Sequence, residues 1–427
     1  MGRHPDGRKT PSIARRERIC TDLASSLLLR GLVNTTTPSA RRLLRRSKND
    51  RRRASQAASL GLRYVASSEL SLRRRKRGRG FSYHEPDGSP LRDREDVSRI
   101  NALVIPPAWT EVRIAADADA HIQAVGTDQA GRVQYIYHPR WKMLREWRKV
   151  RRMLEFAEAL PKVRAGIRQD LKAPAGSQRL ALAVGAGLID ASAIRIGGER
   201  HHRRTGACGA VTLRRSHVSV NGRVVRLCFP AKGGKQFRCD LESPRLTAPI
   251  RRLRSLPGRR LLVYENGGGE IAPLRAQHLN DYLTELAGHR ISAKDFRTFQ
   301  ATALAGDLLA QITPEATSAK RDRQLAAVMR QVAEVLGNTP AMARSSYVHE
   351  VVQACFIGGT LAEQWNRSGR RPALMEAHEA ALARLLKAVA PARVRAPKEK
   401  SLLESLAASL PPGEAPSARA SRPEQQR

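Results

Sequence analysis

Residues 321–347, RDRQLAAVMRQVAEVLGNTPAMARSSY, show the most regular helical pattern in the chain. Apolar side chains recur there every three to four residues and so share one helix face: Leu325, Val328, Met329, Val332, Val335 and Leu336. Gly337 predicts the end of that helix. Pro340 predicts the start of the next one, because proline fits a first helical turn. The stretch therefore predicts helices on both sides of a short polar turn, followed by Tyr347.

The pattern remains mostly helical on both sides of this stretch. Residues 177–190, 276–287, 295–311 and 373–390 carry further helical periodicity. Between them, residues 218–220 and 224–227 flank Asn221-Gly222, a pair that fits a two-residue type I′ hairpin turn, and residues 236–241 can add a third strand. We expect a mainly helical domain over about 145–385, with a three-stranded element near 217–241.

The N-terminal third has a different composition. Short β-like runs at 112–115, 122–125 and 133–137 predict a small β-rich domain over about 60–140. Residues 1–58 are basic and rich in Ser and Thr, without sustained periodicity, and residues 391–427 are rich in Pro, Ala, Ser and Glu. We expect both ends to be disordered. The fold class expected for the whole chain is α+β.

The charge of the chain indicates a polyanionic partner. The 427 residues include 77 Lys and Arg against 39 Asp and Glu, a formal charge of +38, and residues 61–390 alone carry +24. Such a cationic folded region favours nucleic acid first and an anionic membrane surface second. No apolar run reaches the roughly 18–20 residues that span a bilayer. Aromatic residues make up only 4%, which disfavours base-stacking domains.

The five cysteines give little sign of a disulfide framework or a metal site. Their odd number and wide spacing disfavour a secreted, disulfide-bonded scaffold. Cys208, Cys228 and Cys239 lie near His201 and His202, but no C-x-x-C or H-x-x-x-H pair supplies two zinc ligands. We therefore expect thiols without a metal, no cofactor and an intracellular location.

Acidic residues are sparse and form no cluster of the kind that holds divalent ions in metal nucleases. Cutting a DNA backbone without such ions requires cations around the phosphate, a nucleophile and a proton for the leaving oxygen. One set of side chains in the helical region could supply these: Arg195, Lys232, Arg297, Asn338 and Tyr347. Each also has an ordinary structural explanation; Asn338, for example, fits a helix cap.

The order and local context of these residues are more specific than any one of them. The segments Tyr135-Ile-Tyr137-His-Pro-Arg-Trp-Lys142, Ile194-Arg195-Ile-Gly, Lys294-Asp-Phe-Arg-Thr298 and Val335-Leu-Gly-Asn-Thr-Pro340, followed by Tyr347, resemble type IB DNA topoisomerases. The likeness is to the small poxvirus-like enzymes of bacteria and spans about residues 60–360. The tails lie outside it.

This resemblance implies a role for each matching residue. Tyr347 would attack the scissile phosphorus and form a 3′-phosphotyrosyl bond. Arg195 and Arg297 would hold the non-bridging oxygens, and Lys232 would protonate the 5′-oxygen, with Lys235 of the same turn as the alternative. Asn338 stands where many relatives have His and would donate a neutral hydrogen bond. The expected DNA contacts are Tyr135, Tyr137, Arg140, Lys142 and Lys294.

The resemblance also implies a monomeric, nucleoid-associated cytoplasmic isomerase that closes as a clamp around duplex DNA and needs neither ATP nor metal. Tyrosine recombinases share this catalytic plan, but they commonly place His three residues before the second arginine, where this chain has Lys294. A site-specific recombinase therefore stays the alternative enzyme. A non-enzymatic nucleoid-binding protein would explain the charge but not the ordered set of residues.

Overall fold

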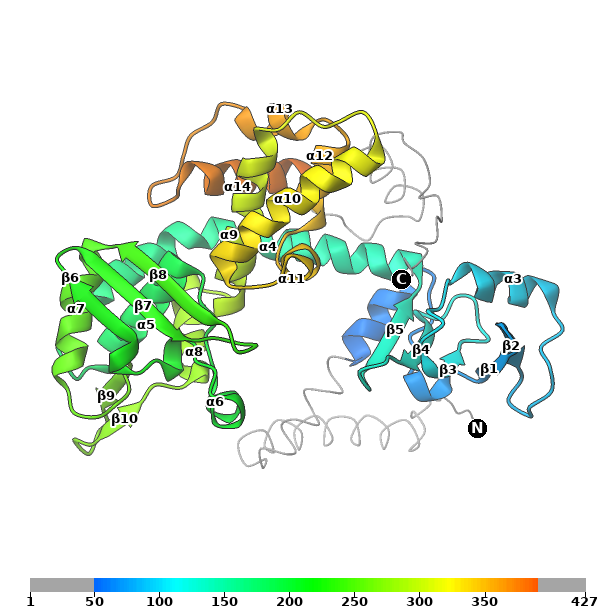
Figure 1. The fold of residues 1–427 in the computed structure, drawn as a ribbon, viewed down its shortest axis with the longest axis horizontal. Coiled ribbons are helices and arrows are strands. Elements are labelled where there is room, and N and C mark those ends of the chain that lie inside the picture. Colours follow the sequence, from blue (N-terminus) through cyan, green and yellow to red (C-terminus); the bar gives the residue numbers. More distant parts are fainter. Residues whose placement is uncertain (1–49, 391–427) are drawn as a thin grey trace, which may run out of the picture. The chain divides into compact units, whose positions relative to one another are not determined.

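The computed structural model describes residues 50–390, which divide into two compact units at the boundary between Leu144 and Arg145. The first unit is built on a β-sheet, and the second is mainly helical with a small sheet of its own (Figure 1). The α+β class expected from the sequence is therefore confirmed.

The first unit contains a five-stranded antiparallel sheet in the order β2-β1-β3-β4-β5. Its strands are β1 (Leu72–Arg77), β2 (Gly80–His84), β3 (Thr110–Ile114), β4 (Ile122–Thr127) and β5 (Val133–Tyr137). The short helices η2 (Ser67–Glu69) and α3 (Arg94–Ala102) accompany them. Buried Ile100 of α3 packs against Leu72, Ile114 and Ala124. Sequence analysis missed β1 and β2, because the first reads LRRRKR and shows no alternation of apolar residues.

The ordered part of the chain begins earlier than expected. Residues 50–58 are helical, and Ala57 is fully buried in a cluster with Leu62 and Trp141. The expectation of a disordered arm up to residue 58 is therefore wrong for its last nine residues. Residues 1–49 and the tail 391–427 lie outside the described residues.

Helix α4 (Pro139–Asp170) is the longest helix of the described part, and the boundary between the units falls within it. Its first turn carries Trp141, whose ring lies 4.8 Å from that of His121 in a T-shaped contact within the first unit. Beyond the boundary, Phe156 packs edge-on against Phe296, with 4.9 Å between ring centroids. Residues 139–170 thus form one continuous helix with apolar contacts on both sides of the boundary.

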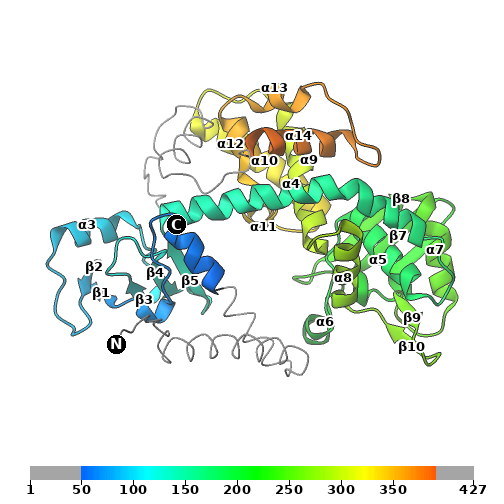
Figure 2. The same ribbon diagram turned by 180° about the vertical axis from the view of Figure 1, so that it is seen from behind.

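The three-stranded sheet of the second unit contains β6 (Val218–Asn221), β7 (Val224–Pro230) and β8 (Gln236–Glu242), all antiparallel. Helices α5 (Gln178–Ser192) and α7 (Pro244–Ser255) lie against one face of it (Figures 1 and 2). The predicted hairpin is present, but Asn221 pairs with Val224, so its loop is Gly222-Arg223. Only the glycine has positive φ, so the expected type I′ Asn-Gly turn is wrong.

The remaining helices pack mainly around α9 (Ala293–Ala310), the central helix of this unit (Figure 2). Its neighbours are α8 (Ala276–Ala287), α10 (Ser318–Leu336), α12 (Glu350–Ile357), α13 (Leu361–Asn366) and α14 (Ala377–Val389). The shorter elements of the unit are α6 (Glu199–Thr205), η3 (Ala210–Thr212), η4 (Arg215–His217), β9 (Val263–Glu265), β10 (Ile271–Pro273) and α11 (Pro340–Ser346). Within residues 50–390, no helix combines the length and the apolar character needed to cross a membrane.

Candidate active site

Arg297 lies in the first half of α9 and is only 3% exposed. The carboxylate of Asp295 fixes the start of this helix by accepting hydrogen bonds of 2.8 Å from both the backbone N–H and the hydroxyl of Ser292. The guanidinium of Arg297 donates one hydrogen bond to the carbonyl oxygen of Ala193 and a second, of 2.5 Å, to that of Leu336. Its Nε has no hydrogen-bond partner among the described residues. One cation thus joins the ends of α5 and α10, and its Nε–H stays without a partner in the described residues.

Asn338 occupies the turn between α10 and α11. Gly337 ends α10 in the left-handed conformation, with φ of 60°. The side chain of Thr339 then caps α11 by accepting a hydrogen bond from the backbone N–H of Met342 at 3.3 Å. Thr339, not Asn338, is therefore the helix cap, and the structural explanation considered for Asn338 does not hold.

The amide of Asn338 is buried and oriented by Arg195. Arg195 donates a hydrogen bond to Oδ1 of Asn338. Because a guanidinium can only donate, this contact identifies the amide oxygen and leaves Nδ2 on the other side. Nδ2 is buried and has no partner among residues 50–390. A buried donor without a partner is costly, so the arrangement suits an acceptor brought by a ligand.

The position of Arg195 follows from an unusual stretch of backbone after α5. Helix α5 is followed by Ala193, a non-glycine residue in the left-handed conformation with φ of 50°. The next residues pack against the 209–211 segment, where Ala210 donates its N–H to the carbonyl of Arg195 at 2.8 Å. A Cβ on Gly209 would lie 2.5 Å from that same carbonyl, so only glycine allows this close approach.

Tyr347 follows the last turn of α11 and is partly buried against the main core. Its ring lies beside Arg297, with 4.8 Å between the guanidinium carbon and the ring centroid. Burial alone would raise the pKa of the phenol, but the charges of Arg297 and Arg195 outweigh it and hold that pKa below 10. Burial and the neighbouring Arg195 lower the pKa of Arg297 to about 10, so it remains a cation at neutral pH.

Lys232 makes no polar contact with the four residues described above, which are Arg195, Arg297, Asn338 and Tyr347. It is exposed in the turn between β7 and β8 and has no hydrogen bond or ion pair to any residue in 50–390. The turn is closed by the hydrogen bond from the N–H of Ala231 to the carbonyl of Lys235, at 2.7 Å. Lys235, in contrast, contacts Asn338: its Nζ donates to the backbone carbonyl of that residue at 3.3 Å.

The residues expected to bind DNA lie in both units. Tyr135 of β5 is 40% exposed, and its ring stacks on Tyr137 with 5.9 Å between centroids. Tyr137 itself packs against the buried clusters of the first unit. Arg140 and Lys142 are exposed at the start of α4, and Lys294 is exposed in the first turn of α9.

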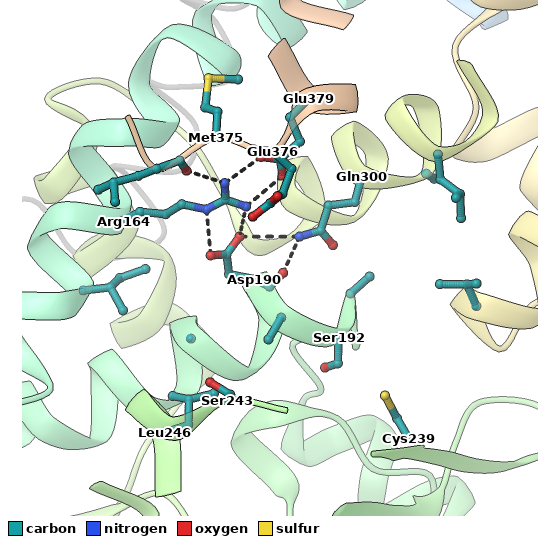
Figure 3. A pocket seen from close by; sticks show the side chains of 18 of the residues that line it. Arg164, Asp190, Ser192, Cys239, Ser243, Leu246, Gln300, Met375, Glu376 and Glu379 are labelled. Carbon is teal, nitrogen blue, oxygen red and sulfur yellow. Dashed lines mark hydrogen bonds and ion pairs between the residues drawn. The ribbon is translucent and has the colours of Figure 1, made fainter. Parts of the chain in front are cut away.

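An ionic cluster of Arg164, Asp190 and Glu379 lies near Ala193 and Leu336, whose carbonyl groups accept hydrogen bonds from Arg297. Sequence analysis missed this cluster. Arg164 of α4 binds Asp190 of α5 through contacts of 2.8 and 2.9 Å, and Glu379 of α14 through contacts of 2.6 and 2.8 Å (Figure 3). Gln300 of α9 donates to the backbone carbonyl of Asp190. The only sequence signal was a charged residue between the apolar positions of a helix, which is a weak one.

This cluster lines a cavity of about 1000 Å³ whose wall also includes Ala193 and Leu336, the two residues whose carbonyl groups accept from Arg297. Figure 3 shows Arg164 between the carboxylates of Asp190 and Glu379, with Gln300 beside them. The four helices that meet there therefore support the backbone on which Arg297 and Arg195 depend.

Comparison with known proteins places this site in a family. Residues 138–355, half of the chain, match the family model described as the catalytic core of eukaryotic DNA topoisomerase I. Residues 80–128 match the model of the bacterial DNA topoisomerase IB N-terminal domain. A curated relative, "DNA topoisomerase 1B" of Acanthamoeba polyphaga mimivirus, is 31% identical over 282 residues, which cover 64% of this chain and 84% of the relative.

These matches define the class of protein as an isomerase that acts on DNA. The chain belongs to the type IB DNA topoisomerases. The resemblance inferred from the sequence motifs is confirmed, and with it duplex DNA as the partner.

Proposed function

We propose that this enzyme relaxes supercoiled duplex DNA by cutting and rejoining one strand through a 3′-phosphotyrosyl bond to Tyr347, without ATP or a required metal ion. One observation carries the proposal: the Tyr347 phenol lies beside the guanidinium of Arg297, while Arg195 orients the Asn338 amide. Such a group of donors suits a phosphate that gains charge in a transition state.

In the cleavage step, the Tyr347 oxygen forms a bond to the scissile phosphorus, and the bond from phosphorus to the 5′-oxygen breaks. The phenol gives up its proton to a solvent water, and the departing 5′-oxygen gains one from Lys232. Arg195 and Arg297 bind the non-bridging oxygens, a task that suits the planar guanidinium. Asn338 donates its free N–H to the same phosphate.

Religation is the same reaction in reverse. The 5′-hydroxyl attacks phosphorus, the phenolic oxygen of Tyr347 leaves, and the two protons return to their original positions. One phosphodiester is exchanged for another at each step, so no ATP is consumed. While the 5′-end is free, the duplex turns about the intact strand and supercoils are lost.

We assign proton donation to the 5′-oxygen to Lys232 rather than to Lys235. Lys235 already donates to the backbone of Asn338, which supports a role in holding the turn against the site. Lys232 is exposed, has no partner in the described part of the chain, and is free to meet a DNA strand. Lysine suits the task because its pKa shifts readily when it is desolvated.

Binding of the duplex would use exposed groups on both units. Tyr135, Arg140 and Lys142 of the first unit and Lys294 of the second are placed at the surface, and Tyr137 supports the ring of Tyr135 by stacking. We propose phosphate contacts for these residues, since Lys and Arg supply most non-specific DNA affinity. We also propose that the enzyme acts as a monomer on the nucleoid.

The test is relaxation of a supercoiled plasmid with EDTA present and ATP absent. We expect full relaxation by the wild-type chain, and neither relaxation nor covalent protein–DNA adduct with Tyr347→Phe, which lacks only the hydroxyl. Complete dependence on a divalent ion would overturn the metal-independent mechanism. Covalent trapping of DNA by Tyr347→Phe would show that another residue is the nucleophile.

A further inference from the structure

We infer that Thr302 of α9 is a positioning residue that holds the nucleophile turn, residues 347–349, at a fixed place relative to Arg297. The inference rests on the proposed role of Tyr347. Thr302 is fully buried, and its Oγ1 lies 3.0 Å from the backbone carbonyl oxygen of Tyr347. The same Oγ1 accepts a hydrogen bond of 3.1 Å from the backbone N–H of His349. One hydroxyl therefore bonds the chain on both sides of Val348.

These two bonds are specific to the nucleophile turn. Within residues 50–390, Thr302 is the one partner of both the Tyr347 carbonyl and the His349 N–H. Oγ1 also lies 2.8 Å from the carbonyl of Thr298, the usual helical alternative for a threonine hydroxyl. Because the hydroxyl carries a single proton, its bond to Tyr347 competes with an intrahelical bond.

The other backbone hydrogen bonds of the turn run back to α11: the N–H groups of Tyr347 and Val348 donate to the carbonyl of Ala343 at 3.2 and 2.9 Å. Tyr347 has left helical geometry, with φ of −126° and ψ of −41°, and His349 begins α12 by capping it, its Nδ1 accepting from the N–H of Val351 at 3.1 Å. The turn thus joins two short helices that contact different neighbours, α11 against α10 and α12 against α9. Thr302 fixes its middle to a third helix.

That third helix is the one that carries Arg297. Thr302 follows Arg297 by five residues in an unbroken α-helix, a rise of about 7.5 Å. A rigid element of fixed length therefore connects the guanidinium that binds phosphate with the hydroxyl that holds the Tyr347 backbone. Removing the hydroxyl leaves a buried carbonyl and a buried N–H without partners, and such groups seek new ones. The turn would then move relative to Arg297.

The experiment compares Thr302→Val, which keeps the shape but loses the hydroxyl, with Thr302→Ser, which keeps the hydroxyl. Single-turnover cleavage is measured on a duplex oligonucleotide, and the covalent adduct is mapped by peptide analysis. We expect T302V to cleave about 10²-fold more slowly at unchanged DNA affinity, because a small misplacement of a reacting group slows a reaction by about that factor. T302S should retain most of the rate.

Thr247→Val is the matched control. Thr247 is another buried helical threonine whose hydroxyl donates to a backbone carbonyl, that of Pro244 at 3.0 Å, but it lies in α7 and does not contact the nucleophile turn. T247V should cleave at the wild-type rate. If T302V does not fold, as judged by its thermal unfolding, Thr302→Ala replaces it and should be slow where T302S is fast.

A second substrate separates positioning from proton donation. A bridging 5′-phosphorothiolate has a sulfur leaving group that departs without a proton, because a thiol is much more acidic than an alcohol. It should restore cleavage by Lys232→Ala and leave the T302V defect in place. T302V cleaving at the wild-type rate, T302S as slow as T302V, or rescue of T302V by the sulfur substrate would each overturn the inference. An adduct on a residue other than Tyr347 would instead overturn the proposed function.

Discussion

Arg195 donates a hydrogen bond to the side-chain oxygen of Asn338, and this contact fixes which way the Asn338 amide faces. The N–H side is left buried and without a partner in residues 50–390, next to a tyrosine and two arginines. The pair therefore acts as one unit, in which the arginine supplies charge and orients a neutral donor.

Replacing Asn338 by Ala should slow single-turnover cleavage by about 10²–10³-fold, the range for loss of one oxyanion donor, with little change in DNA affinity. Asn338→His should retain much of the activity, because an imidazole N–H reaches a similar position, and should gain a pH dependence near neutrality. Rapid-quench cleavage over a pH range measures both.

Asn338→Asp is the sharpest variant at this position. Aspartate has nearly the size and shape of asparagine, but it places a negative charge beside the phosphate and removes the donor. We expect severe impairment. Cleavage by the Asp variant at the wild-type rate would show that the side chain is not a donor to the phosphate.

Arg195→Ala should raise the pKa of Tyr347. The wild-type phenol has its pKa held below 10 by Arg297 and Arg195 against the opposing effect of burial, so loss of one charge moves the pKa upward. NMR titration of ¹³C-labelled tyrosines measures this without DNA, and Tyr347→Phe assigns the signal. Arg200→Ala, an exposed arginine of α6, serves as the control. An unchanged Tyr347 pKa in R195A would contradict the electrostatic assignment.

Acid should destabilise the first unit through His121. This ring is 3% exposed, accepts the N–H of Val65 at 3.1 Å and stacks on Tyr64. Burial lowers its pKa from 6.5 to about 4, so the folded state favours the neutral ring. The stability that the neutral His121 ring contributes is fully present above pH 6.5. It is lost as the pH falls from 6.5 towards 4, because the unfolded chain binds the proton first.

Thermal unfolding at several pH values between 7.5 and 4.5, followed by tryptophan fluorescence, measures this loss. His121→Gln cannot titrate in this range and should show a flatter dependence of melting temperature on pH. His289→Gln, at an exposed position of the second unit, should match the wild type. An H121Q slope equal to that of the wild type would refute the prediction.

Loss of Arg164 should be among the most destabilising changes in the second unit. Its side chain is 13% exposed, and those of Asp190 and Glu379 are 19% and 3% exposed. Arg164→Met leaves two buried carboxylates unpaired, which should lower the free energy of unfolding by about 3–5 kcal/mol. Urea denaturation measures it. The triple variant with Asp190→Asn and Glu379→Gln should recover most of the loss.

The sequence predicted the parts of this molecule that depend on local patterns. The apolar stripe of 325–336, the glycine that ends it and the proline after it all appear in the structure as expected. The strand LRRRKR was missed because it shows no alternation of apolar residues, and because its second partner, β3, comes from a distant segment. The role of Thr302 could not be predicted from the sequence either, because the hydrogen bonds of a helical threonine to another segment are known only once that segment is placed.

The candidate site follows the same division. The residue types and their order could be read along the chain, and the structure brings Arg195, Arg297, Asn338 and Tyr347 together. The sequence could not tell that Thr339 caps α11, which leaves the Asn338 side chain free for another use. It also could not rank Lys232 against Lys235, because both lie in one turn and differ only in what they contact.

The turn that carries Lys232 has a consequence for the timing of the reaction. Gly233 and Gly234 have φ of 83° and 74°, and a Cβ at either position would meet no atom within 4 Å. Arg195, Arg297, Asn338 and Tyr347 are thus brought together by the fold, whereas Lys232 lies in an exposed turn beside two glycines. If Lys232 is the proton donor, as we propose, DNA binding and strand cleavage are separate events: the strand stays intact while the enzyme moves along DNA, and it is cut only where a bound duplex brings this lysine to the scissile phosphate.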